Sequence, residues 1–164
     1  RPINVESKRL NQAIFLDASG NVQSLRSKFY LPNQFPAMEM PWFDEGDKPG
    51  KVFELLGHRI GVQLCRELMF AEVPRILGAN GATIIIQSRA TGDHPRWRAA
   101  SVLSASTSGA FVIGSNRRSV DRDWFTGGSW AYGPTGMLIA ETSEAKPIIT
   151  VQINSTFSDA VPHE

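Results

Sequence analysis

The chain has 164 residues, of which 41% are hydrophobic and 20% charged, and its 17 basic and 16 acidic side chains leave a formal net charge of +1. This length suffices for one domain with a sizeable core, and the balanced charge gives no support for binding to nucleic acid or to a membrane surface. The single cysteine excludes an internal disulfide, so a reducing, cytoplasmic location is expected. No apolar run is long enough to span a bilayer, and the three histidines lack the spacing of a zinc site.

The first part of the chain is expected to form a β-hairpin followed by a long loop. Residues 12–18 and 22–31 have the composition of two strands, with turn residues between them. Residues 32–50 are rich in proline and carry many apolar side chains, including Trp42 and Phe43. So much apolar surface favours an ordered loop that covers a pocket over a disordered linker.

The rest of the chain mixes strands and helices. Strands are expected at residues 52–56, 59–64, 82–87 and 110–115, helices at 70–79 and 96–108, a hairpin at 127–142 that turns at 133–136, and a final strand at 146–154. This order predicts one α/β domain over residues 1–154, with a short tail at 155–164.

Cys65, the only cysteine, lies where the apolar strand 59–64 turns toward the helix 70–79. Such a corner places a side chain at the carboxyl end of a strand, where open α/β sheets bind ligands, and leaves backbone N–H groups without helical partners. A thiol there is a candidate nucleophile. A cysteine that only packs in the core is the competing interpretation.

Cysteine hydrolysis of an amide also needs charge or N–H donors for the oxyanion, and a group that moves protons. Lys28, near the end of the second expected strand, is a candidate to stabilise the oxyanion and the thiolate. Glu39 is a candidate to hydrogen-bond this lysine and shuttle protons. The backbone N–H of Arg66, directly after Cys65, is a candidate second oxyanion donor.

The motifs around these residues resemble those of the carbon–nitrogen hydrolase (nitrilase) superfamily. They follow one another as Leu10-Asn11-Gln12-Ala13, Arg26-Ser27-Lys28-Phe29-Tyr30-Leu31-Pro32, Glu39 with Trp42-Phe43-Asp44-Glu45-Gly46, Arg59 to Glu67 with Phe70 and Glu72, Phe125-Thr126-Gly127-Gly128-Ser129, and Pro147 to Ile153. The resemblance runs from about residue 10 to about residue 154. It implies an αββα sandwich in which Lys28 and Cys65 belong to a Glu-Lys-Cys triad and Glu39 is an additional, supporting glutamate.

The resemblance also implies a reaction. The enzyme would cleave a non-peptide carbon–nitrogen bond in a small amide, carbamoyl or ureido compound through a cysteine thioester, with no metal or organic cofactor. Family members place the triad's first glutamate well upstream of the lysine, and Glu6 does not match that motif. The chain is therefore expected to lack the N-terminal part of the domain.

Family members commonly pair through the helices that correspond to residues 70–79 and 96–108, so a homo-oligomer is expected. Trp42, Phe43 and Arg89 are expected to line the substrate pocket, and Arg98 is a candidate to replace an arginine that family members carry. Two other functions stay open. In the first, the chain is a non-catalytic or degenerate family member that serves as an interaction protein. In the second, the acyl group of the cysteine thioester is transferred to an acceptor other than water.

Overall fold

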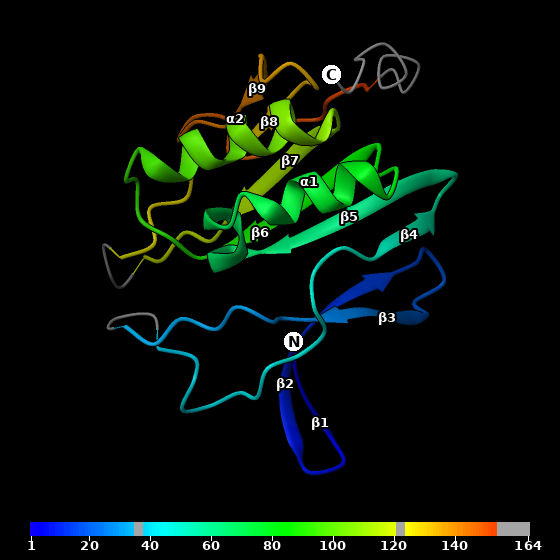
Figure 1. Ribbon diagram of the computed structural model, residues 1–164. Helices are drawn as coiled ribbons and strands as arrows, with labels where there is room; N and C mark the ends of the chain where they lie inside the picture. Colours follow the sequence, from blue (N-terminus) through cyan, green and yellow to red (C-terminus); the bar gives the residue numbers. More distant parts are fainter. Residues whose placement is uncertain (35–37, 121–123, 154–164) are drawn as a thin grey trace.

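The computed structural model describes residues 1–34, 38–120 and 124–153, and its strands form two sheets (Figure 1). The first is antiparallel, in the order β1-β2-β3, with strands Pro2–Val5, Lys8–Leu16 and Val22–Ser27. The second has the order β4-β5-β6-β7-β8-β9, with strands Val52–Leu55, His58–Leu64, Ile84–Arg89, Phe111–Asn116, Trp130–Tyr132 and Leu138–Glu141. Strands β5, β6 and β7 are parallel, and β4, β8 and β9 join them antiparallel.

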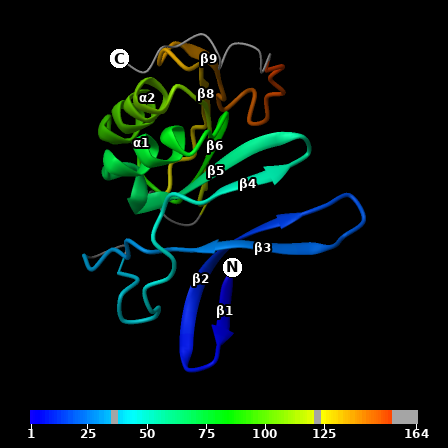
Figure 2. The ribbon, with the colours of Figure 1, turned by 45° about the vertical axis from the view of Figure 1, so that its right-hand side comes forward.

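Two α-helices, α1 (Glu72–Ala79) and α2 (Arg96–Ser108), pack side by side on one face of the second sheet. Buried side chains from both helices and from β6 to β8 form the main core: Val73, Leu77, Ala82, Ile85, Ala105, Ala110, Val112 and Tyr132. The first sheet lies on the other side of the second (Figure 2). The expected α/β sandwich is confirmed as helix, sheet and sheet layers. In the described residues no helix covers the outer face of the first sheet.

The alternation of side chains along β5 divides the helix side from the side that faces the first sheet. Ile60 and Val62 point toward the first sheet, where they line a cavity. Gly61 and Gln63 point toward the helices, and Leu77 of α1 lies so close to Gly61 that an added Cβ would meet it at 3.0 Å. Strand β5 therefore carries packing on one face and the wall of a site on the other.

Helix α2 is rich in serine because a buried polar network lies beneath it. Gln87 of β6 donates to the side-chain oxygen of Gln63 at 2.8 Å and accepts from the hydroxyl of Ser101 at 2.6 Å. The hydroxyl of Ser104 donates to Gln63 at 3.2 Å. All four side chains are fully buried, and these hydrogen bonds satisfy polar atoms that would otherwise be costly in the core. The amide nitrogen of Gln63 is the exception, since it has no partner among the described residues.

The structure corrects four sequence predictions. An additional strand, β1, precedes the expected hairpin. Strand β3 ends at Ser27 rather than at residue 31, because the carbonyl of Lys28 accepts from Gly46 and the N–H of Phe29 donates to Glu67. A 3₁₀ helix (Cys65–Met69) occupies the turn, and α1 starts at Glu72 rather than at residue 70.

The last correction concerns the strand expected at 146–154. Residues 146–153 form no strand. The prediction rested on alternating side chains, but a strand also needs a neighbouring strand whose backbone it can bond to. Residue 154 and the predicted tail at 155–164 lie outside the described residues. The hairpin around 133–136 is confirmed, with the N–H of Gly133 donating to the carbonyl of Met137.

Candidate active site

Cys65 is the first residue of the 3₁₀ helix that follows β5, and its backbone is left-handed, with φ of +49°. Residues other than glycine rarely adopt this conformation, because Cβ crowds the following carbonyl. It is typical of side chains that a sharp strand-to-helix turn presents at a functional site. The sequence indicated the corner at Cys65, but the left-handed backbone has no signal in the residue types.

Lys28 follows the last residue of β3 and is held from both sides through its backbone. Its N–H donates to the carbonyl of Asn11 at 2.7 Å, and its carbonyl accepts from the N–H of Gly46 at 2.9 Å. The side chain is 1% exposed, and its ammonium donates to Oε1 of Glu39 at 2.6 Å. A buried ammonium is stable only with such a partner. The contact expected between Lys28 and Glu39 is thus present, whereas their catalytic roles remain predictions.

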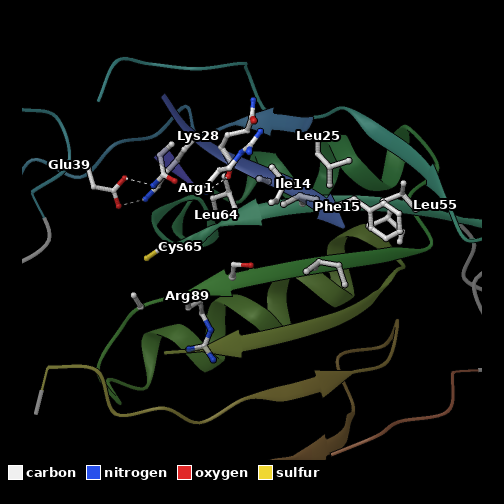
Figure 3. A pocket seen from close by; sticks show the side chains of 18 of the residues that line it. Arg1, Ile14, Phe15, Leu25, Lys28, Glu39, Leu55, Leu64, Cys65 and Arg89 are labelled. Atoms are coloured by element: carbon white, nitrogen blue, oxygen red, sulfur yellow. Dashed lines mark hydrogen bonds and ion pairs between the residues drawn. The ribbon is translucent and has the colours of Figure 1, made fainter. Parts of the chain in front are cut away.

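A cavity of about 730 Å³ between the two sheets brings Cys65, Lys28, Glu39 and Arg89 together (Figure 3). Cys65 projects at the same end of the cavity as the Lys28–Glu39 pair. Most of the remaining wall is apolar and comes from both sheets: Ile14, Phe15, Leu25, Leu55, Ile60, Val62, Leu64 and Ile86. The arrangement offers a thiol, a buried cation and a carboxylate at the mouth of an apolar hollow.

A second charged pair, missed by the sequence analysis, lies behind the site. Glu67, in the 3₁₀ helix, accepts from Nη1 of Arg26 at 2.5 Å and from Nη2 at 2.8 Å. The same carboxylate accepts from the backbone N–H groups of Phe29 at 3.0 Å and Leu64 at 2.8 Å. Phe29 follows Lys28 and Leu64 precedes Cys65, so Glu67 holds the lysine segment and the cysteine corner against each other.

Glu72 and Tyr30 add a third connection between the same two segments. The hydroxyl of Tyr30 donates to Oε1 of Glu72 at 3.0 Å, and this hydrogen bond to a carboxylate raises the pKa of Tyr30. The Tyr30 ring also stacks on Phe70, with ring centroids 3.8 Å apart. The start of α1 is thereby tied to the segment that follows Lys28.

The two aromatic residues expected in the pocket lie elsewhere. Trp42 is 63% exposed, and Phe43 packs under the guanidinium of Arg9. Neither is among the described residues that line the cavity, where the aromatic side chains are Phe15 and Phe125. The loop 38–50 does reach the cavity, through Glu39 and its neighbour Met38.

The arginines expected near the site have different surroundings. Arg66 lines a smaller pocket of about 300 Å³ that also reaches Cys65. Arg89 lines the main cavity at the end of β6. Arg98 is ion-paired with Glu141 and also donates to the hydroxyl of Tyr132 at 3.4 Å, and the pair with Glu141 raises the pKa of Arg98.

The described residues contain no cluster of three or more His, Cys, Asp or Glu side chains placed to hold a metal ion. Across the same ranges, no helix combines the length and apolar character that crossing a membrane requires.

Comparison with known proteins places these features in a family. The family model "Carbon-nitrogen hydrolase" matches residues 4–162. The N-carbamoylputrescine amidase of Arabidopsis thaliana is 26% identical over 159 residues, which cover 86% of this chain and 53% of that protein. The citrullinase of Francisella tularensis is 24% identical, over 82% of this chain and 52% of its own length. The chain spans about half the length of these curated relatives.

Solved structures agree on the fold. A carbon–nitrogen hydrolase superfamily protein from Xanthomonas campestris superimposes with a TM-score of 0.78 at 20% identity, over 96% of this chain and 62% of that one. The amidase of Nesterenkonia sp. AN1, solved with butyramide, gives a TM-score of 0.69 at 24% identity, over 81% of this chain and 51% of that one. At these identities the likeness supports the fold alone, and the family model carries the assignment. The chain belongs to the carbon–nitrogen hydrolase family.

Proposed function

We propose that the protein hydrolyses a non-peptide carbon–nitrogen bond in a small amide, carbamoyl or ureido compound, with Cys65 as the nucleophile. The observation that carries this proposal is the convergence of Cys65 and the buried Lys28–Glu39 pair at one end of a single cavity. Each of these residue types has an ordinary structural use. The three side chains lie together beside a strand-to-helix corner with a left-handed backbone, in a member of the carbon–nitrogen hydrolase family. This combination favours a catalytic role over a structural one.

In the proposed reaction the sulfur of Cys65 attacks the substrate carbonyl carbon, and the carbonyl oxygen takes up the negative charge. The ammonium of Lys28 and the backbone N–H of Arg66 stabilise this oxyanion. The carbon–nitrogen bond then breaks, and the leaving nitrogen takes a proton and departs as ammonia or an amine. Water attacks the resulting thioester, which releases the acid and restores the thiol.

Glu39 has a supporting role in this proposal. Its hydrogen bond to Lys28 keeps the ammonium in position, and Asn11 donates to its other oxygen at 3.4 Å. The general base that takes the thiol proton is assigned to the further glutamate that the resemblance implies upstream of Lys28, and no residue of this chain is assigned to that step.

The names of the relatives favour the carbamoyl and ureido part of the substrate range. An N-carbamoylputrescine amidase and a citrullinase both align over more than four-fifths of this chain, at 26% and 24% identity. Simple amides stay within the proposal, because attack on a carbonyl carbon that bears nitrogen is the shared step.

The test uses the full-length protein and measures ammonia release from butyramide and from propylurea. Cys65→Ala is expected to abolish release while the melting temperature stays within a few degrees. Lys28→Gln is expected to lower kcat/KM at least about a hundredfold, because an oxyanion donor of this kind contributes roughly 10²- to 10³-fold. Lys146→Gln, which removes an exposed ammonium, is the matched control and should leave kcat/KM unchanged.

Mass spectrometry gives a second measurement. Iodoacetamide should label Cys65 in the folded protein, and an acyl adduct on Cys65 should accumulate during turnover. Added hydroxylamine captures the thioester as a hydroxamate, and the ratio of hydroxamate to free acid shows whether the thioester reacts with an added acceptor in preference to water. A folded full-length protein whose Cys65 resists iodoacetamide, and which turns over no amide, urea or nitrile, would contradict the proposal and favour an interaction protein.

We also propose that the protein forms a homo-oligomer through its helix layer. Ile76 of α1 and Leu103 of α2 are large apolar side chains exposed on this layer. Light scattering during size-exclusion chromatography should give at least twice the monomer mass, and Ile76→Asp with Leu103→Asp should reduce it. An unchanged monomer mass for the native protein would contradict this assignment.

A further inference from the structure

Arg89 is a buried cation whose described partners are all uncharged. It is 6% exposed, and its guanidinium lies 3.7 Å from the centre of the Trp130 ring. Nη2 donates to the carbonyl of Gly128 at 2.8 Å, and Nη1 makes a long contact of 3.4 Å to the hydroxyl of Thr91. Nε is buried and has no hydrogen-bond partner. A charge-bearing nitrogen is thus left unsatisfied.

Two other arginines, Arg26 and Arg98, are neutralised by carboxylates. Arg26, equally buried, is bonded to both oxygens of Glu67. Arg98 lies 5.1 Å from the same Trp130 ring but is paired with Glu141. Within residues 1–34, 38–120 and 124–153, no carboxylate forms an ion pair with Arg89. A buried charge of this kind is costly unless an anion joins it.

The position of Arg89 relates it directly to the nucleophile. Leu64 of β5 and Ser88 of β6 are partners in the parallel ladder, so Cys65 and Arg89 follow at the same carboxyl edge on neighbouring strands. Neighbouring strands lie about 5 Å apart. Arg89 is among the residues that line the cavity of Cys65 and Lys28, at the end where Cys65 lies, and its guanidinium points from the end of β6 to the side opposite Lys28 (Figure 3).

Arg89 also borders an adjoining pocket of about 440 Å³. The acidic side chains on that pocket are Glu141, which is engaged by Arg98, and Asp93, which is exposed to solvent. Solvent weakens the field of an exposed carboxylate, whereas the charge of Arg89 acts from a buried position. The uncompensated charge beside Cys65 is therefore positive.

We propose that Arg89 binds a carboxylate of the substrate, which makes the preferred substrate a short amide or carbamoyl compound that also bears a carboxylate. The carboxylate accepts from the N–H of Nε, the guanidinium nitrogen that has no hydrogen-bond partner in the described part of the chain. The indole of Trp130 keeps the guanidinium plane fixed. This inference rests on the proposed hydrolase function, because it names the substrate class of that same site.

The experiment compares two amides of nearly equal shape on the full-length protein, butyramide and succinamate, which differ in a methyl group and a carboxylate. Propylurea and 3-ureidopropionate form the matching carbamoyl pair. We expect kcat/KM to be at least about tenfold higher for the carboxylate member of a pair, the size of a charge-assisted hydrogen bond. Arg89→Gln should remove this preference, because kcat/KM falls further for the carboxylate member than for the neutral member. Arg89→Lys should retain part of the preference.

Arg75→Gln is the matched control, since it removes an exposed guanidinium on α1 and should keep the native preference. Melting temperatures confirm that each variant folds. If Arg89→Gln does not fold, the comparison of the two amides on the native protein still tests the preference for a carboxylate. Equal rates for both members of each pair, or an equal fall for both in Arg89→Gln, would overturn the inference and leave the hydrolase function intact.

Calorimetric binding to Cys65→Ala protein separates the two proposals. Tighter binding of succinamate than of butyramide, lost when Arg89 is replaced, supports the carboxylate site. This holds even if no compound is turned over, because the absence of turnover would contradict only the hydrolase function. Equal or absent binding of the two compounds in Cys65→Ala, with no preference in turnover, would overturn the carboxylate site.

Discussion

Glu67 and Arg26 form a two-pronged ion pair, with nitrogen–oxygen distances of 2.5 and 2.8 Å, between two almost fully buried side chains. Since Glu67 also accepts the N–H groups of Phe29 and Leu64, this carboxylate joins the segments that carry Lys28 and Cys65. Removal of its charge leaves the guanidinium of Arg26 buried and unpaired.

Glu67→Gln is therefore expected to lower the free energy of unfolding by about 3–5 kcal/mol, the usual cost of breaking one side of a buried pair. Urea denaturation measures this change. Glu144→Gln is the control, because Glu144 pairs with Arg118 on the surface, where the two side chains are 84% and 61% exposed. Such a pair contributes less than about 1 kcal/mol to the free energy of unfolding. Equal losses for the two variants would show that the buried pair does not support the site.

Cys65 offers a test of backbone strain that is separate from its chemistry. Because φ is +49°, Cys65→Gly is expected to be more stable than Cys65→Ala by about 1 kcal/mol, the reverse of the usual order. Both variants should be inactive. Chemical denaturation of the two proteins gives the comparison, with Ser88→Gly and Ser88→Ala on β6 as controls in which alanine should be the more stable. A Cys65→Ala variant at least as stable as Cys65→Gly would contradict a strained corner.

Much of the second sheet and the placement of the site could be predicted from sequence. The apolar run before Cys65 and the continuous run Ile84-Ile85-Ile86 predict buried strands, and the corner at Cys65 follows from a strand that precedes a helix. The parallel pairing of these two strands was not predicted. The contact of Lys28 with Glu39 was expected from the groups that cysteine hydrolysis of an amide needs, and it is present. These features have local signals, namely hydrophobic runs and short motifs.

The features that the sequence missed depend on distant parts of the chain. Arg26 and Glu67 are 41 positions apart, and neither has a neighbour that marks it as buried. Gln87 and Ser101 are polar residues that a pattern of hydrophobic positions cannot place inside. Trp42 shows the opposite error. Its apolar side chain, in a proline-rich loop, was expected to line the pocket and is instead exposed to solvent.

Gly46 is expected to control the position of Lys28. A Cβ at this position would lie 2.4 Å from Cβ of Ser27 and 2.6–2.7 Å from its backbone carbonyl atoms, so the loop must move. Gly46→Ala should lower the free energy of unfolding by about 1–3 kcal/mol and reduce kcat/KM, because the Gly46 N–H also bonds to the carbonyl of Lys28. Gly133→Ala, where the nearest atom is 3.6 Å away, is the control for both measurements. Native-like values for Gly46→Ala would mean that the loop yields without disturbing Lys28.

Two serines of α2 separate the buried network from helix propensity. Ser101 and Ser106 each donate to the carbonyl four residues earlier, at 3.1 Å, but only Ser101 also donates to Gln87. Ser101→Ala should lower the free energy of unfolding by about 1–3 kcal/mol because Gln87 loses a buried partner. Ser106→Ala should be neutral or slightly stabilising, since alanine favours helix. Similar effects of the two substitutions in urea would argue against a stabilising role for the network.

The titration of Arg89 gives a signature that other groups do not produce. Burial lowers the pKa of Arg89 from its ordinary value to about 10. A cation with a lowered pKa in the folded state destabilises the fold below that pKa, and this penalty fades as the pH rises through 10 and the guanidinium loses its proton. A carboxylate on the substrate therefore has a charged partner only below about pH 10.

We expect the ratio of kcat/KM for succinamate to kcat/KM for butyramide to stay constant between pH 8 and about pH 9, and to fall toward one above about pH 10. The ratio cancels every pH effect that the two amides share, and the succinamate carboxylate is ionised throughout this range. Short assays with checks of folding at each pH provide the measurement. A ratio that stays high up to pH 11 would assign the preference to a group other than Arg89.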